Sequence, residues 1–272
     1  MHNKNKYFLL ATGTLLAYML VIVMNFLANA LPINGILANE VSDAYPNLFA
    51  PTNIAFSIWG LIFFFLALYV FRQFVVAAKT DSFEQNSADL ALIAVYFILS
   101  SLANGVWVLT WHFKIIWLSV IFMLVILILL LLINRIIATL RKNNHFSWLQ
   151  QWSLRIPFSL YFGWITVATI ANITTFLVSI GFTGFGLSDV TWMIFVSLLG
   201  TLIAVAIILY FQDFVFGLAV SWGYLGILIR HLATDGFQSE FPQIIWTISC
   251  LLAILLTTCL IAAYREFFRT KD

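Results

Sequence analysis

Two segments of the chain carry tryptophan, polar and small side chains at helical spacing. The first stripe consists of Ser100, Asn104, Trp107 and Trp111, and the second consists of Tyr161, Trp164, Ala168 and Asn172. At about 100° per helical residue, the members of each stripe lie within about 80° of one another. Aromatic rings can stack on a flat apolar molecule, and an amide can orient it. The chemistry expected of these stripes is the binding of a flat hydrophobic ligand.

Helix packing is the competing interpretation of both stripes. Asparagine and small residues join membrane helices, and tryptophan fills the space between them. An asparagine in hydrocarbon needs a hydrogen-bond partner, so both interpretations direct the stripes toward the protein interior. Packing explains one stripe alone more readily, whereas two stripes together favour an apolar pocket with few polar groups.

The sequence shows no motif for metal binding or covalent catalysis. The histidines are His2, His112, His145 and His231. They lack the spacing of a metal site, and His112 is expected at the membrane interface. No phosphate-binding glycine loop is present, and no nucleophile motif has a base nearby. We therefore expect no required cofactor.

The composition places most of the chain in a lipid bilayer. Of its 272 residues, 63% are hydrophobic and 9% are charged, whereas about a quarter of the residues in a soluble domain are charged. This composition excludes a soluble enzyme, a nucleic-acid-binding protein and a disordered chain.

Eight apolar stretches are long enough to cross about 30 Å of hydrocarbon as helices. They cover residues 7–30, 53–72, 90–111, 115–138, 156–180, 190–211, 214–229 and 243–264. The seventh follows the sixth after only Gln212 and Asp213, yet one helix over 190–229 would be about 60 Å long. Arg230 is expected to extend to the interface at the end of the seventh stretch. The predicted fold is all-α and integral to the membrane, with about eight transmembrane helices.

The charges lie at or near the predicted helix ends. Arg135, Asp89 and Asp213 come closest to the interior of a stretch. Proton pumps and ion-coupled transporters usually carry a buried carboxylate, so the sequence disfavours that class. The basic and aromatic segment 141–155 is expected at the inner headgroup layer, where it would anchor the chain.

The distribution of basic residues predicts the topology. With eight spans, two basic residues, Lys114 and Arg230, fall on one side of the membrane. Eleven fall on the other side, namely Lys4, Lys6, Arg72, Lys79, Arg135, Arg141, Lys142, Arg155, Arg265, Arg269 and Lys271. Removing the seventh span would weaken this bias. Because basic loops stay cytoplasmic, we expect both termini in the cytoplasm and the 31–52 loop outside, in a bacterial plasma membrane.

Three segments resemble the TspO/MBR family, the tryptophan-rich sensory proteins or translocator proteins. Residues 161–172 look like the family pattern Tyr-x-x-Trp-x-Ser/Thr-x-Ala-x-x-x-Asn, and residues 102–107 are similar to its Leu-Asn-x-x-Trp region. The segment from Pro51 through Phe56 to Trp59 resembles its proline-rich turn. There the second proline of the family is missing, and the spacing from phenylalanine to tryptophan is one residue shorter.

The resemblance implies a five-helix bundle that binds porphyrins or other flat hydrophobic ligands. It covers roughly residues 7–180, which predicts a TspO-like unit over 1–180 and three additional helices with a short tail over 181–272. The 31–52 loop would cover the pocket mouth, and porphyrin or haem is the expected ligand. The implied pocket residues are Trp59, Asn104, Trp164 and Ala168, with Trp107 and Tyr161 nearby; the second stripe adds Asn172.

Three classes of function remain open. A binding protein or sensor is favoured by the resemblance. A transporter of a hydrophobic or amphipathic solute is the alternative, because eight spans suffice for a translocation path. A membrane enzyme that degrades porphyrin is the least favoured.

The additional helices carry Gly217, Gly223 and Gly226, which would permit close helix packing. Trp222 and Tyr224 are interpreted there as apolar filler. These helices could cover the surface through which short family members dimerise, so the oligomeric state stays open.

Overall fold

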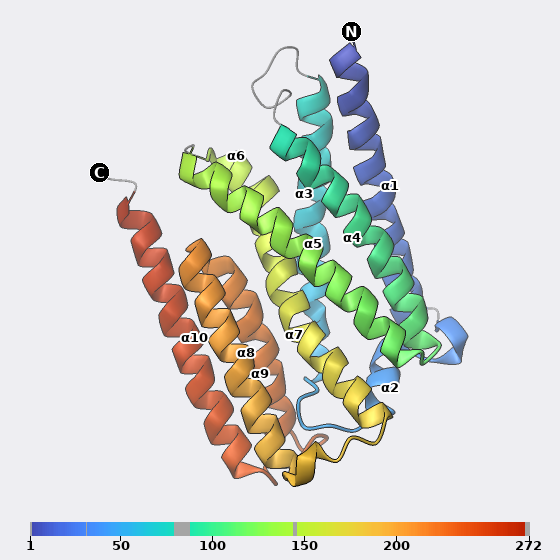
Figure 1. The fold of residues 1–272 in the computed structure, drawn as a ribbon, viewed down its shortest axis with the longest axis vertical. Helices are drawn as coiled ribbons and strands as arrows, with labels where there is room; N and C mark the ends of the chain where they lie inside the picture. The colour runs from blue at the N-terminus through green and yellow to red at the C-terminus, as the bar shows by residue number, and fades with distance from the viewer. Residues whose placement is uncertain (1, 31, 79–87, 144–145, 270–272) are drawn as a thin grey trace. The chain divides into compact units, whose positions relative to one another are not determined.

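A computed structural model describes residues 2–30, 32–78, 88–143 and 146–269 of the chain (Figure 1). Lys79, His145 and Lys271 lie outside these residues. The long helices are α1 (His2–Ala30), α3 (Ile58–Ala78), α4 (Ala88–His112), α5 (Ile116–Asn143), α7 (Ile156–Ser179), α8 (Asp189–Phe211), α9 (Phe214–Leu232) and α10 (Pro242–Arg269). The short elements are α2 (Ala38–Asp43), α6 (Trp148–Gln150), the π-helical turn Gln151–Arg155 and the 3-10 turns Ile33–Gly35, Asn53–Ser57 and Gly184–Gly186.

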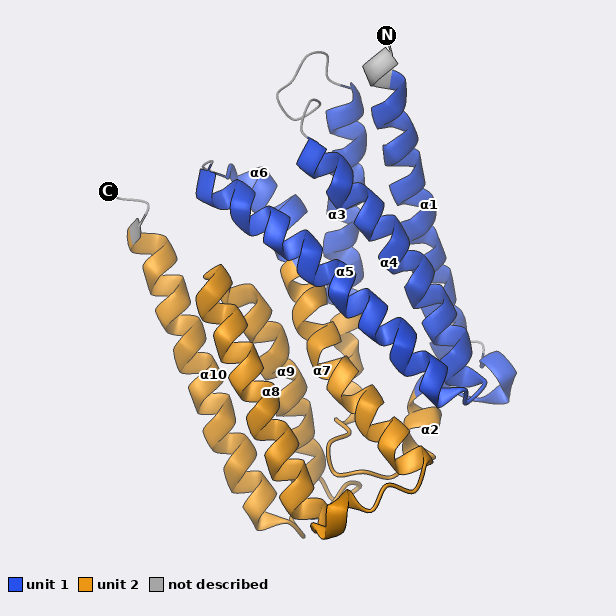
Figure 2. Cartoon of the chain, viewed as in Figure 1, with its two compact units in different colours: residues 1–38, 60–158 blue, residues 39–59, 159–272 orange. Residues whose placement is uncertain are grey.

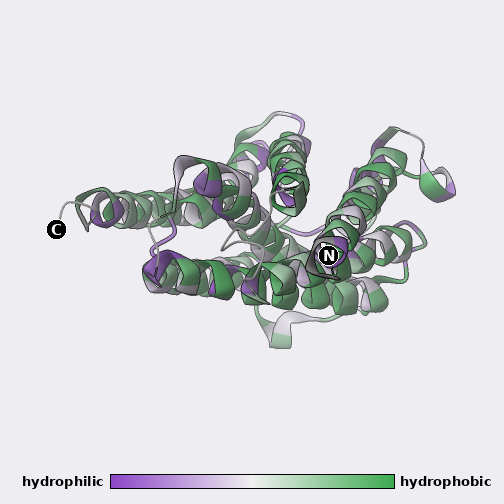
Figure 3. Ribbon diagram, turned by 90° about the horizontal axis from the view of Figure 1, so that it is seen from above, coloured by the Kyte–Doolittle hydropathy of each residue, from purple (hydrophilic) through white to green (hydrophobic). Residues whose placement is uncertain are grey.

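The predicted membrane fold is confirmed. Within the described residues, eight helical stretches are long and apolar enough to cross a membrane, and hydrophobic residues predominate along them (Figure 3). The predicted tight turn between the sixth and seventh spans is present, because α8 ends at Phe211 and α9 begins at Phe214. Gln212 makes this turn in the left-handed conformation, with φ of 49°.

Helices continue past the apolar runs, which corrects the expected position of two charges. Helix α3 extends to Ala78, and the helical path into α7 starts at Trp148. Arg72 and Arg155 therefore lie inside helical segments rather than at their ends, and both side chains are buried. Ser147 begins the second segment with a capping box, in which its side chain and that of Gln150 accept each other's backbone N–H groups.

The chain divides into two compact units (Figure 2). Unit 1 comprises residues 1–38 and 60–158, and unit 2 comprises residues 39–59 and 159–272. The boundary predicted at residue 180 follows family resemblance rather than compactness, and it stays a prediction.

In unit 1, the end of α4 is tied to the end of α1 and to Ala38. His112 is buried by protein, and its two ring nitrogens lie 2.7 Å from the Val108 carbonyl and 3.4 Å from the Ala28 carbonyl. Its expected place at the depth of the membrane interface stays a prediction. The neighbouring Trp111 donates its indole N–H to the Ala38 carbonyl at 3.0 Å. A neutral imidazole carries one N–H group, so that of His112 donates to one of its two carbonyl neighbours, Val108 or Ala28.

In unit 2, glycines bring α9 into close contact with its neighbours. A Cβ atom on Gly163 of α7 would lie 2.5 Å from the Phe216 carbonyl oxygen, and one on Gly223 would lie 2.8 Å from a Val167 methyl group. Added Cβ atoms on Gly217 and Gly226 would also meet neighbouring side chains closely. The predicted close packing of this helix is confirmed, and it explains why small residues occur at these positions.

The turn before α9 is closed by Asp213. One of its carboxylate oxygens accepts hydrogen bonds from the backbone N–H groups of Val215 and Phe216, at 3.1 and 3.4 Å. The other oxygen accepts a hydrogen bond from the Ser159 hydroxyl, near the start of α7. The buried carboxylate therefore both caps α9 and links it to α7.

Candidate functional site: an aromatic cluster in unit 2

Four aromatic side chains of unit 2 meet in what we call the aromatic cluster, formed by Phe56, Trp59, Tyr161 and Trp164. The ring centroid of Trp59 lies 5.6 Å from that of Tyr161 and 6.4 Å from that of Trp164. The Phe56 ring lies 5.7 Å from the Trp164 ring. All three contacts are edge-to-face, an arrangement that the aromatic quadrupole favours. The structure thus brings together three of the predicted site residues, Trp59, Tyr161 and Trp164.

Trp164 contributes a polar group to this apolar cluster. Its side chain is 2% exposed, and no acceptor among the described residues reaches its indole N–H. Leaving a buried donor unsatisfied costs about 1–3 kcal/mol. An acceptor atom on a ligand beside the cluster would remove that cost and orient the ligand.

The rest of the second stripe continues along α7. Ala168 and Asn172 follow Trp164 by one and two helical turns, as the sequence pattern predicts. Asn172 is buried and Ala168 is partly buried. Their predicted roles beside a ligand stay predictions.

Asn104 and Trp107 lie in unit 1, on α4. Asn25 of α1 donates its amide to the Asn104 side-chain oxygen at 3.0 Å. The Asn104 amide nitrogen and the Trp107 indole nitrogen are buried, without an acceptor among the described residues. The Trp107 ring stacks on Trp111 with centroids 6.0 Å apart. The first stripe therefore serves helix packing through Asn25 and also retains two unsatisfied donors.

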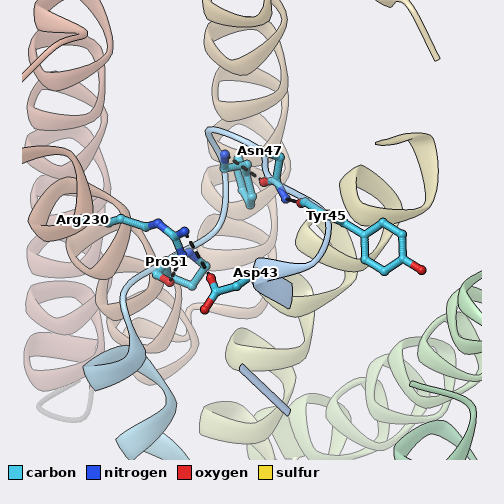
Figure 4. Close-up of polar contacts among 6 residues, drawn as sticks. Asp43, Tyr45, Asn47, Pro51 and Arg230 are labelled. Carbon is cyan, nitrogen blue, oxygen red and sulfur yellow. Dashed lines mark hydrogen bonds and ion pairs between the residues drawn. The ribbon is translucent and has the colours of Figure 1, made fainter. Parts of the chain in front are cut away.

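Residues 43–57, which we call the docked loop, pack against α9. Asn47 shapes this loop by donating its amide to the Tyr45 carbonyl at 3.0 Å and accepting from the Phe49 N–H at 3.1 Å. Arg230 reaches back from α9 to the loop (Figure 4). It donates to Asp43 at 3.2 Å and to the Pro51 carbonyl at 3.4 Å. The loop thus supplies the partners of Arg230, and the expected extension of its side chain to the membrane interface stays a prediction.

Three residues of α9, spaced four apart, face the docked loop. Trp222 donates its indole N–H to the Ala55 carbonyl at 2.9 Å. The Gly226 carbonyl accepts from the Thr52 N–H at 3.1 Å, and Arg230 completes the stripe. The Nε2 atom of His231 lies 3.0 Å from the Leu48 carbonyl oxygen, which also belongs to the docked loop.

The interpretation of Trp222 and Tyr224 as filler is wrong. Trp222 binds the docked loop, and the Tyr224 hydroxyl donates to the Ser197 carbonyl of α8 at 2.8 Å. Sequence analysis missed Phe56, Trp222 and Gly226 as residues that surround or support the cluster. Trp222, Gly226 and Arg230 are spaced four residues apart, which places them on one face of a helix. The sequence alone does not show that the docked loop packs on this face.

Comparison with known proteins decides the family. Residues 10–261 match the family model described as TSPO-like protein. The chain belongs to this family. No curated protein matches the chain, and no solved structure matches it.

The TSPO-like match includes the C-terminal helices. It extends beyond residue 180, where the resemblance to short members ends, and reaches residue 261 in α10. The contacts of α9 with the docked loop and α7 agree with this extent, because they join the C-terminal helices to the segments that carry the aromatic cluster.

Proposed function

We propose that this TSPO-like protein is a membrane-embedded binding protein or sensor for a flat hydrophobic ligand such as a porphyrin. The observation that carries the proposal is the aromatic cluster, in which the Trp59 ring contacts those of Tyr161 and Trp164, and Trp164 has a buried indole N–H. Aromatic walls with few polar groups are typical of sites for flat apolar ligands. Membership of the TSPO-like family supports the same class of function.

The ligand expected at this cluster is planar and carries a hydrogen-bond acceptor. The rings of Trp59 and Trp164 would provide apolar contact, and the Trp164 indole N–H would donate to the acceptor. Protoporphyrin IX is a suitable probe because it combines a flat macrocycle with carboxylate oxygens. Ala168, one turn beyond Trp164, presents a small side chain that would leave room beside such a ligand.

Replacing Trp164 with phenylalanine should weaken the binding of protoporphyrin IX about fivefold, because it removes one hydrogen-bond donor while keeping an aromatic ring. The measurement is a fluorescence-quenching titration of the purified protein in detergent micelles. Trp246→Phe is the matched control, since Trp246 is exposed on α10. Equal affinity in wild type and Trp164→Phe, or equal loss in both variants, would refute the assignment of the site.

We also propose that the protein lies in the plasma membrane with both termini in the cytoplasm. Within unit 2, the Arg230–Asp43 ion pair supports one part of this topology, because it requires the end of α9 and the docked loop to lie on the same side. With the native cysteines replaced by alanine, Glu240→Cys should react with an impermeant maleimide in intact cells, and Asn143→Cys should react only after permeabilisation. Both positions are exposed in the structure. The opposite labelling pattern would contradict the proposed orientation.

A further inference from the structure

We propose that α9 positions the ligand site: Trp222 and Gly226 hold the Asn53–Ser57 turn so that Phe56 and Trp59 reach Trp164. Trp222 and Gly226 are positioning residues, because the rings that contact Trp164 belong to Phe56 and Trp59. The inference rests on the proposed function for its effect on ligand binding, but the placement of the turn can be measured without a ligand.

The Ala55 carbonyl connects the turn to α9. It accepts the Trp222 indole N–H at 2.9 Å and also the backbone N–H of Ile58, where α3 begins. Ala55 is fully buried. In the chain it lies between the preceding loop and the two residues whose rings join the cluster, Phe56 and Trp59. The indole therefore fixes the turn at its centre.

Gly226 determines how closely the turn approaches α9. A Cβ atom at this position would lie 2.6 Å from the Ala55 Cβ and 3.2 Å from the Pro51 Cβ. The Gly226 carbonyl also accepts the Thr52 N–H, at the residue that precedes the turn. Only a residue without a side chain permits this contact, so the turn and α9 must separate if the glycine is replaced.

Helix α9 also contacts α7, the helix that carries Trp164. Gly163, adjacent to Trp164 in α7, would place a Cβ atom 2.7 Å from the Ala219 Cβ of α9. Helix α9 thus contacts both the turn that carries Phe56 and the helix that carries Trp164. The position of α9 therefore sets the separation between the Phe56 and Trp164 sides of the cluster.

A size exchange between Gly226 and Ala55 tests the inference. In protein labelled with 5-fluorotryptophan, Gly226→Ala should shift the ¹⁹F resonance of Trp59 in the absence of ligand. Adding Ala55→Gly should return the resonance toward its wild-type position, because the second change removes the Cβ atom that the new methyl group meets. Trp59→Phe assigns the resonance.

Ligand binding should follow the same pattern. We expect Gly226→Ala to weaken protoporphyrin IX binding about tenfold and the Gly226→Ala/Ala55→Gly pair to recover most of the loss. Trp222→Phe should weaken binding about fivefold, because it keeps the ring and removes the donor. Trp246→Phe and Gly217→Ala are controls; the latter disturbs α9 at Cys259 and Ile208, away from the turn.

The outcomes separate the inference from the proposed function. If the Trp59 resonance does not move in Gly226→Ala, or Ala55→Gly fails to restore it in a folded protein, the positioning role is refuted. If the resonance moves but affinity is unchanged, or Gly217→Ala weakens binding equally, the contact between Gly226 and the turn does not control the affinity. If wild type binds no porphyrin, the proposed function fails, and the resonance still decides whether α9 holds the turn.

Discussion

Replacing Gly163 with alanine should lower the free energy of unfolding by about 2–3 kcal/mol, the upper range for an overpacked interior. The added Cβ atom would lie 2.5 Å from the Phe216 carbonyl oxygen and 2.7 Å from the Ala219 Cβ. Because the first neighbour is backbone, rotation of a side chain cannot relieve the contact, and α7 and α9 must move apart. Reversible unfolding in mixed detergent micelles measures the loss.

Gly105→Ala provides the matched control for this prediction. Gly105 is also buried within a long helix, but a Cβ atom there would meet Leu20 at an ordinary 3.6 Å. Alanine has a higher helix propensity than glycine by about 1 kcal/mol, so this variant should be unchanged or slightly more stable. Equal stabilities of Gly163→Ala and Gly105→Ala would show that α7 and α9 are not packed as described.

Replacing Asp213 with alanine should cost about 3 kcal/mol of stability. The change removes the cap of α9, typically worth about 1 kcal/mol, and leaves the buried Ser159 hydroxyl without its partner, which costs about 1–3 kcal/mol. The carboxylate accepts from Val215, Phe216 and the Ser159 hydroxyl in the structure. The same unfolding measurement applies.

Two further variants identify the cause of that loss. Asp213→Asn retains a side-chain oxygen for the helix cap and an amide that can donate to Ser159, so it should cost about 1 kcal/mol. In a Ser159→Ala background, Asp213→Ala should lower the free energy of unfolding by less than it does in wild type, because the two side chains share one interaction. Full additivity of the two losses would contradict the link between α7 and α9.

The transmembrane helices could be predicted from the sequence because hydrocarbon demands long apolar runs. The two-residue turn at Gln212 and Asp213 was also predictable, since a single helix over that region would exceed the membrane thickness. The places where helices end were less predictable. Arg72 and Arg155 lie in helical segments that continue past their apolar runs, and hydropathy does not report such extensions.

The candidate site was predictable only in part. Helical spacing identified the face of α7 that carries Tyr161 and Trp164, because that pattern is local. The contact of Trp59 with both rings agrees with the resemblance, but spacing alone did not indicate it. The support from Trp222 and Gly226 joins segments about 170 residues apart in sequence, and a single sequence does not show which loop faces which helix.

The docking of the loop on α9 changes the interpretation of the C-terminal helices. Sequence comparison with short TspO proteins treats them as additions, whereas α9 contacts both segments that carry the aromatic cluster. In this TSPO-like chain, a ligand that moves the Asn53–Ser57 turn would therefore act on α9 through the contacts of Ala55 with Trp222 and Gly226.

The proposed binding of a flat hydrophobic ligand at the aromatic cluster is tested most directly by ¹⁹F spectroscopy of protein labelled with 5-fluorotryptophan. On titration with protoporphyrin IX, the macrocycle ring current should shift the resonances of Trp59 and Trp164 saturably, while exposed Trp246 stays unchanged. Trp→Phe variants assign the three signals. Saturable binding that leaves Trp59 and Trp164 unshifted, or that shifts only Trp246, would contradict the account.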